Sequence, residues 1–316
     1  MNLLKKISIV CVTVLAISYF IPVQTTKNAV IKKTFYDVVS EINNPDNWKK
    51  WYSPIKSSYQ KHPEKYRFVE DYKNKKFIIY THNNKYIVTK YSPGYLKVQS
   101  NGLFKTNCEV RFTFTKDSHK SIVFETHTIS LLTYVLNFFK PDNQYDSVIK
   151  NLKPFMENPS LYYGFEIKRT HVPDTIYLTL SKTILAKNRY IATDSMYKIL
   201  TKYALKNKLT RTFKPYLVQN TLGNDSLTIT AMLVIDTAIM PDSKITSFTM
   251  PSGGNILVAR YKGRYSASKT VYDALQKYVF DNTLSSVFTP FERYLDKRIP
   301  KNDSSIVDME VFYPIY

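Results

Sequence analysis

The stretch KGRYSASKTVYDALQKYVFDNTLSSVFTPF, residues 262–291, decides the architecture of the second half of this chain, because it repeats an earlier stretch. The earlier copy, KNRYIATDSMYKILTKYALKNKLTRTFKPY, occupies residues 187–216, and the two copies are identical at 12 of 30 positions without a gap. The identical pairs are Lys187/Lys262, Arg189/Arg264, Tyr190/Tyr265, Ala192/Ala267, Tyr197/Tyr272, Leu200/Leu275, Lys202/Lys277, Tyr203/Tyr278, Asn207/Asn282, Leu209/Leu284, Phe213/Phe288 and Pro215/Pro290. A repeat of this length indicates one supersecondary unit used twice.

Each copy predicts a strand, a helix and two further strands, because its apolar spacing changes from alternation to helical periodicity and back. Asn188 and Gly263 occupy the same position of the repeat and are the residue types that most readily accept a left-handed turn. Asn207 and Asn282 stand where they can cap the helix ends. The expected elements are strands at 176–184, 216–220, 227–235, 255–261, 291–295 and 306–312, and helices at 191–206 and 266–281. Two such modules about an approximate twofold axis would leave a groove at their centre.

One position distinguishes the two copies in chemistry. Leu217 of the first copy corresponds to Glu292 of the second, so a carboxylate occurs in one copy alone. By strand alternation Glu292 shares a face with Tyr294, while Arg293 takes the other face. The alternative is a solvated Glu292 that pairs with Arg293 or Lys297 at the surface.

The second half, residues 162–316, resembles the GyrI-like small-molecule-binding domain, also known as the effector-binding domain of AraC- and MerR-type regulators. The resemblance rests on MPSGGNILVARYKGRY, on the helix that follows, on TPFERYLDKRIP and on the closing DMEVFYPIY. It implies that Glu292 faces the central groove, where family members hold lipophilic and often cationic ligands. The expected ligand-binding residues are Glu292, Tyr294, Tyr265, Tyr261 and Tyr190.

Two classes of function follow from this resemblance. The first is a non-catalytic binding protein in which a carboxylate among aromatic rings holds a hydrophobic or cationic small molecule. The second is a hydrolase of strained electrophiles that uses a Glu and a Tyr as acid–base partners, a class of enzyme that some GyrI-like proteins resemble. Binding without turnover is the preferred interpretation, so no catalytic residue is assigned.

Composition excludes several other classes. The seven Gly include neither a dinucleotide-binding nor a phosphate-loop pattern, and the five His and two Cys lack the spacings of metal motifs, so no cofactor or metal is expected. The net charge of +20 fits a membrane surface, a nucleic acid or a solubilising coat. Because Lys and Arg are spread evenly and no helix-turn-helix pattern occurs, nucleic acid is not an expected partner.

The leader MNLLKKISIVCVTVLAISYFIPVQ predicts attachment to a membrane. Residues 7–23 are apolar apart from Ser8, Thr13 and Ser18, which is at the short end of a membrane span. A cleaved signal peptide is the rival interpretation, but no small-x-small cleavage site follows. We therefore expect a single-pass cell-membrane protein anchored by residues 1–24, with the side of the soluble part left open.

The first half, residues 25–158, predicts a strand or short helix, an antiparallel meander and a closing helix at 146–155. The expected meander strands are 66–71, 76–82, 85–91, 95–100, 108–115 and 121–129. The elements INNPDNWKKWYSP and DSVIKNLKPF resemble the opening and closing parts of SRPBCC (START, polyketide cyclase-like) domains, which implies a helix-grip fold. Trp48 and Trp51 are expected to pack in its core. The expected fold class is therefore α+β: an anchor, a helix-grip domain and a duplicated domain.

Overall fold

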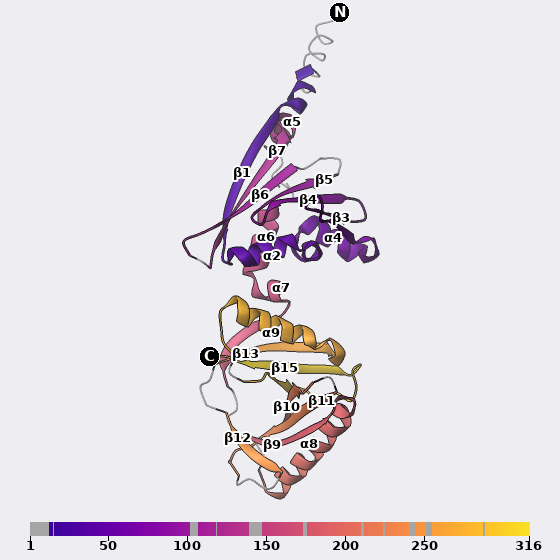
Figure 1. Cartoon of the computed structure of the whole chain (residues 1–316), viewed down its shortest axis with the longest axis vertical. Coiled ribbons are helices and arrows are strands. Elements are labelled where there is room, and N and C mark those ends of the chain that lie inside the picture. Colours follow the sequence, from indigo (N-terminus) through magenta and orange to yellow (C-terminus); the bar gives the residue numbers. More distant parts are fainter. Residues whose placement is uncertain are drawn as a thin grey trace, which may run out of the picture. The chain divides into compact units, whose positions relative to one another are not determined.

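The computed structural model describes residues 13, 14, 16–101, 107–117, 119–138, 147–172, 176–209, 212–223, 225–239, 244–250, 255–286 and 288–316. The chain divides into two compact units, Met1–Asn158 and Pro159–Tyr316. Each unit is built on one antiparallel sheet with helices, so the fold is of mixed α+β class, as the sequence predicts at this level (Figure 1).

Unit 1 contains a seven-stranded antiparallel sheet in the order β1-β7-β6-β5-β4-β3-β2. Each strand after β1 pairs with its neighbour in sequence, and β7 returns to pair with β1. Its strands are β1 (Pro22–Ile31), β2 (Arg67–Asp71), β3 (Lys76–Tyr80), β4 (Lys85–Ser92), β5 (Tyr95–Ser100), β6 (Asn107–Phe114) and β7 (Ser121–Ser130). Its helices are α2 (Phe35–Asn43), α3 (Trp48–Trp51), α4 (Ser53–Lys61), α5 (Leu131–Phe138) and α6 (Val148–Glu157).

The core of unit 1 confirms the expected role of the two tryptophans. Trp48 and Trp51 are buried with ring centroids 4.7 Å apart, and the Trp48 indole donates to the carbonyl of Ile42 at 2.8 Å. Helix α6 begins at a Ser147 cap and packs against β1 and β7. The strand–helix–meander–helix order expected for the first half is therefore present, and the SRPBCC resemblance itself stays a prediction.

Within the expected membrane anchor at residues 1–24, residues 1–12 and 15 lie outside the described residues. Strand β1 starts at Pro22, so Pro22, Val23 and Gln24 belong to the sheet and the expected boundary at Thr25 is too late. In the part of the chain that the structure describes, no helix combines the length and the apolar character needed to cross a membrane.

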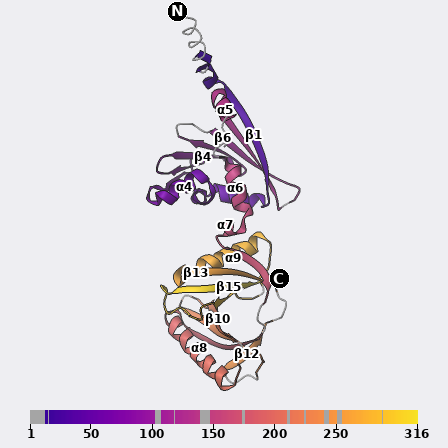
Figure 2. The same ribbon diagram turned by 180° about the vertical axis from the view of Figure 1, so that it is seen from behind.

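Unit 2 contains an eight-stranded antiparallel sheet in the order β12-β9-β11-β10-β14-β15-β13-β8. Helices α8 and α9 cover one face of this sheet, α8 against β9 and β11 and α9 against β13 and β15 (Figure 2). The strands are β8 (Ile167–His171), β9 (Ile176–Leu185), β10 (Thr212–Thr221), β11 (Ser226–Val234), β12 (Ile245–Thr249), β13 (Asn255–Arg264), β14 (Phe291–Tyr294) and β15 (Ile306–Pro314). The helices are α7 (Pro159–Tyr163), α8 (Arg189–Lys206) and α9 (Lys269–Asp281).

The strand order of unit 2 reflects the sequence repeat. The first copy supplies β9, α8, β10 and β11, and the second supplies β13, α9, β14 and β15, so that β10 and β14 meet at the centre of the sheet. The strand that precedes each copy pairs with the other copy: β8 pairs with β13, and β12 pairs with β9. The two copies are therefore interlocked at both edges of the sheet.

The helix ends repeat in detail, as expected for Asn207 and Asn282. Both are C-cap residues, and each side-chain amide donates to the carbonyl four residues earlier, at 2.9 Å to Tyr203 and 2.8 Å to Tyr278. The expected left-handed turns at Asn188 and Gly263 are wrong: Asn188 has φ −96°, and Gly263 lies inside β13. The left-handed residues of the repeat are instead Lys208 (φ 55°) and Thr283 (φ 50°), which directly follow the capping asparagines. The left-handed position of the repeat therefore follows each helix and does not precede it.

Candidate functional site

The site lies where the two repeats meet. In the pairing of β10 with β14, Leu217 stands directly opposite Glu292, so equivalent positions of the two copies face each other. Strand alternation places both residues on the helix-covered face, while Tyr216 and Phe291 belong to a separate cluster on the other face. A single Glu at this point therefore lies at the centre of unit 2, under the helices.

Glu292 is buried, with 2% of its surface exposed, and its hydrogen-bond donors are tyrosine hydroxyls. Tyr272 on α9 donates to Oε1 at 2.8 Å, and Tyr265 reaches Oε1 and Oε2 at 3.1 and 3.2 Å. Tyr294, two residues along β14, donates to Oε2. The amide of Gln219 donates in turn to the Tyr265 hydroxyl. The carboxylate is thus fixed by neutral donors from one helix, one strand and one turn.

The alternative of a solvated Glu292 does not fit this geometry. Arg293 points to the other face, where it pairs with Glu310 and donates to the Tyr216 hydroxyl at 3.1 Å. Lys297 has a left-handed backbone (φ 62°) in the turn after β14. In the described part of the chain, neither residue forms an ion pair with Glu292.

Burial raises the pKa of Glu292, and hydrogen bonds from Tyr294, Tyr272 and Tyr265, together with the charge of Arg189, oppose that rise only in part. Burial, and next the negative charge of Glu292, also raise the pKa of each of these three tyrosines. The hydroxyls consequently keep their protons and act as donors.

A second group of polar side chains lies beside the carboxylate. Tyr190 donates to Asp303 at 2.7 Å, and Arg189 pairs with the same carboxylate. The Arg189 guanidinium lies 4.6 Å from the ring centroid of Tyr190 and 5.9 Å from that of Tyr265, and the two rings are 6.2 Å apart, edge to face. Tyr190 and Tyr265 are equivalent in the repeat, so their contact also joins the two copies.

The structure brings together three of the five expected site residues, Glu292, Tyr294 and Tyr265. Tyr190 contacts Tyr265 through its ring but bonds to Asp303. Tyr261 is buried elsewhere in the core, and its hydroxyl donates to the carbonyl of Arg264 at 2.6 Å. Among the described contacts it has none with Glu292, so its expected place in the ligand site stays a prediction.

Sequence reasoning missed Tyr272, Gln219 and Arg189. Tyr272 is the clearest omission, because it is one of the twelve identities between the copies, paired with Tyr197. The apolar periodicity of the second helix predicted a buried face that contains Val271 and Leu275, and Tyr272 lies at the edge of this face. Gln219 occupies the repeat position of Tyr294, so comparison of the copies around Glu292 would have found it.

The site is closed in this structure. A hollow in unit 1 is lined by residues 70–72, 75, 76, 90–93 and Asn43, and another follows α8 from Asp194 to Leu205; Glu292 lines neither. For metals, the described residues contain one group of three with suitable atoms close together, Cys108, Glu125 and His127 in unit 1.

No family model matches the chain, and no curated protein matches it. Several solved structures are similar to about half of it. The EcmrR C-terminal domain is 18% identical with a TM-score of 0.40, over 48% of this chain and 98% of that chain. EcmrR in its DNA complex has the same identity, TM-score and share of this chain, and this chain spans only 57% of it. SAV2435 bound to tetraphenylphosphonium is 11% identical with a TM-score of 0.28, over 48% of this chain and 94% of that chain. These likenesses are compatible with the GyrI-like resemblance and carry no further argument.

Proposed function

We propose that unit 2 binds a lipophilic cationic small molecule, with Glu292 as the anionic contact. The observation that supports this most strongly is the burial of the Glu292 carboxylate, whose hydrogen-bond donors among the described residues are tyrosine hydroxyls. An ionised carboxylate loses its hydration when it is buried, and hydroxyl donors compensate less than a cation does. A cation that enters the site would relieve this cost.

The aromatic rings beside Glu292 support the same ligand chemistry. Arg189 lies over the faces of Tyr190 and Tyr265, and this supports the idea that these rings suit a positive charge. A ligand cation that displaced the Arg189 guanidinium would contact both the carboxylate and the ring faces, and each cation–π contact contributes about 0.5–2 kcal/mol.

Hydrolysis of a strained electrophile is the alternative use of the same residues, with a tyrosine as proton donor to the opening ring. The contacts favour it less, because burial and Glu292 raise the pKa of Tyr265, Tyr272 and Tyr294 and so make them weaker acids. Both carboxylate oxygens are also occupied by hydroxyl donors. Binding without turnover is therefore the better-supported function.

The test is calorimetry with tetraphenylphosphonium and with tetraphenylborate, which has the same shape and the opposite charge. Glu292→Gln keeps the size of the side chain and should weaken binding of the cation by about 1–3 kcal/mol. Binding of the anion should not weaken. Glu310→Gln is the matched control, because that carboxylate pairs with Arg293 on the other face. Equal losses for both ions in Glu292→Gln would mean a structural role, and unchanged affinity for the cation would refute the proposed site.

Attachment to the cell membrane through residues 1–24 also remains a proposal, and it rests on the apolar run 7–23 after Lys5 and Lys6. The full chain should sediment with membranes, whereas a chain that starts at Ile21 should not. The truncated chain keeps β1 complete, so loss of the sheet would not confuse the result. Recovery of the full chain in the supernatant, unprocessed, would contradict the proposal.

A further inference from the structure

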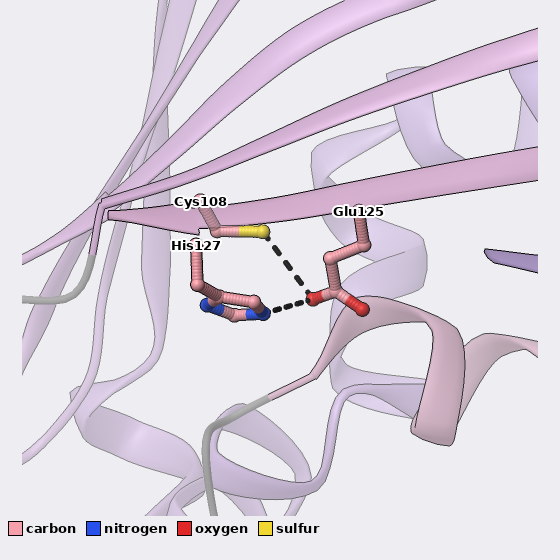
Figure 3. Close-up of side chains that lie close together, drawn as sticks. All are labelled: Cys108, Glu125 and His127. Carbon is pink, nitrogen blue, oxygen red and sulfur yellow. Dashed lines mark hydrogen bonds and ion pairs between the residues drawn. The ribbon is translucent and has the colours of Figure 1, made fainter. Parts of the chain in front are cut away.

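Unit 1 holds a buried group of three side chains that the site in unit 2 does not use. Cys108 on β6 stands directly opposite His127 on β7, and Glu125 lies two residues before His127 on the same face of the sheet. Their exposed fractions are 3%, 1% and 0%. Figure 3 shows the Cys108 and His127 side chains converging on the Glu125 carboxylate.

The three side chains meet at one oxygen atom. Glu125 Oε1 lies 2.9 Å from His127 Nε2 and 3.3 Å from Cys108 Sγ, and the three candidate ligand atoms all lie within 4.8 Å of one another. In a tetrahedral zinc site with bonds of about 2.0–2.3 Å, ligand atoms are separated by roughly 3.2–3.8 Å. Small side-chain shifts would therefore convert this arrangement into three corners of such a tetrahedron.

The carboxylate is also held from its far side by the start of α6. Oε2 accepts from the Ser147 hydroxyl at 2.5 Å and from the Ile149 amide at 3.1 Å, and Oε1 accepts from the Val148 amide at 2.7 Å. Hydrogen bonds of this kind orient metal ligands in known sites. Here Oε2 would stay bound to the helix, and Oε1 would keep its bond from the Val148 amide while it binds the ion.

We propose that Cys108, Glu125 and His127 bind a zinc-class divalent ion, one that accepts sulfur, nitrogen and oxygen ligands. The sulfur ligand selects Zn²⁺, Co²⁺ or Cd²⁺ over Mg²⁺ and Ca²⁺. With three protein ligands, a water molecule would complete the tetrahedron. The ion would join β6 and β7 to the start of α6, and its role would be structural.

The charges and protons balance in this step. The ion takes the place of the Cys108 thiol proton, which leaves to solvent, and His127 binds through Nε2 while its own proton moves to Nδ1. The thiolate and the carboxylate carry one negative charge each, so the ion makes the buried site neutral. Neutrality matters because a net charge in the core is costly. One proton, that of the Cys108 thiol, should therefore be released per ion.

The experiment uses the full chain with Cys11→Ser, which leaves Cys108 as the single thiol. Titration with Co²⁺ at pH 8 should produce a thiolate-to-cobalt absorption band that saturates at one ion per chain, and Zn²⁺ but not Mg²⁺ should abolish it. Ser147→Ala should lower the affinity by about 10–100-fold through loss of the outer hydrogen bond. Ser147 would not contact the metal in this arrangement. A loss of affinity in Ser147→Ala would therefore show that the ion binds at Glu125, whose carboxylate Ser147 orients, and not at an unrelated surface position.

His127→Asn should abolish stoichiometric binding, with its circular dichroism compared with that of the parent to verify folding. The matched control is His82→Asn, because His62 and His82 lie near the surface with rings stacked 4.2 Å apart, where adventitious metal would bind. The proposal would be overturned if the parent protein shows no saturable Co²⁺ band. It would also be overturned if His82→Asn loses Co²⁺ binding while His127→Asn keeps it. If His127→Asn does not fold, the proton release of the parent decides: none would also overturn it.

Discussion

Replacement of Gly263 by Ala tests whether Tyr261 is a fixed part of the core rather than a member of the site. A Cβ at Gly263 would lie 2.7 Å from the Tyr261 hydroxyl oxygen and 3.1 Å from Cζ. Atoms do not approach that closely, so the tyrosine would have to move. The hydroxyl would then lose its 2.6 Å bond to the carbonyl of Arg264.

Two opposing contributions set the change in the free energy of unfolding caused by Gly263→Ala. A buried hydroxyl that loses its partner costs about 1–3 kcal/mol. Replacing Gly by Ala in a regular backbone conformation gains about 0.4–1 kcal/mol through the unfolded state. The clash is the larger contribution, so Gly263→Ala should lower the free energy of unfolding by about 1–2 kcal/mol. In a Tyr261→Phe background the hydroxyl is absent, and the same substitution should cost close to nothing.

Urea unfolding of the four proteins of this double-mutant cycle gives the coupling between the two positions. Far-ultraviolet circular dichroism follows both units, whereas the fluorescence of Trp48 and Trp51 follows unit 1 and serves as an internal reference. A neutral or stabilising Gly263→Ala, or additive effects of the two substitutions, would refute the reasoning. Tyr261 would then be mobile enough to take part in ligand binding after all.

Three further outcomes are expected. The affinity for tetraphenylphosphonium should fall as the pH is lowered, because protonation removes the negative charge of Glu292. Since burial raises the pKa of Glu292, calorimetry should detect this loss of affinity at a pH above about 4.3, the ordinary pKa of Glu. The affinity of Glu292→Gln should not depend on pH in this way. Leu217→Glu would place a second carboxylate opposite Glu292 and should destabilise unit 2 by about 3–5 kcal/mol at neutral pH, less at low pH, in urea unfolding; a neutral effect would mean that the pairing is open to water. Asn207→Ala and Asn282→Ala should each cost about 0.5–1.5 kcal/mol, and clearly unequal losses would show that the two caps are not equivalent.

Periodicity and repetition in the sequence predicted most of the fold. Alternation alone placed the six meander strands of unit 1 close to their observed bounds, because one face of that sheet is buried and the other is not. The repeat located both long helices of unit 2 and the opposition of Leu217 and Glu292. The start of β1 was missed, because Pro22 and Val23 continue the apolar leader in composition and only their pairing with β7 distinguishes them.

The side-chain contacts of both candidate sites were less predictable. Alternation placed Glu292 and Tyr294 on one face of the strand, and the GyrI-like resemblance implied that Glu292 and Tyr265 line the site. The hydroxyl of Tyr272 reaches the carboxylate from a helix, and local periodicity does not predict where a helix packs on a sheet. The cluster of Cys108, Glu125 and His127 was not predicted from the sequence, for a related reason. Metal motifs are recognised by spacing along the chain, whereas Cys108 and His127 are neighbours across two strands.

The pairing of β8 with β13 and of β12 with β9 has a consequence for how this unit can be divided. A polypeptide with one copy alone would carry a leading strand whose partner lies in the missing copy, and exposed strand edges recruit other chains. Such a half should therefore form a symmetric dimer that restores the eight-stranded sheet. Two fragments cut between β11 and β12 should likewise reassociate as a complementing pair. The present arrangement is what fusion of two ancestral subunits, each lending an edge strand to the other, would leave behind.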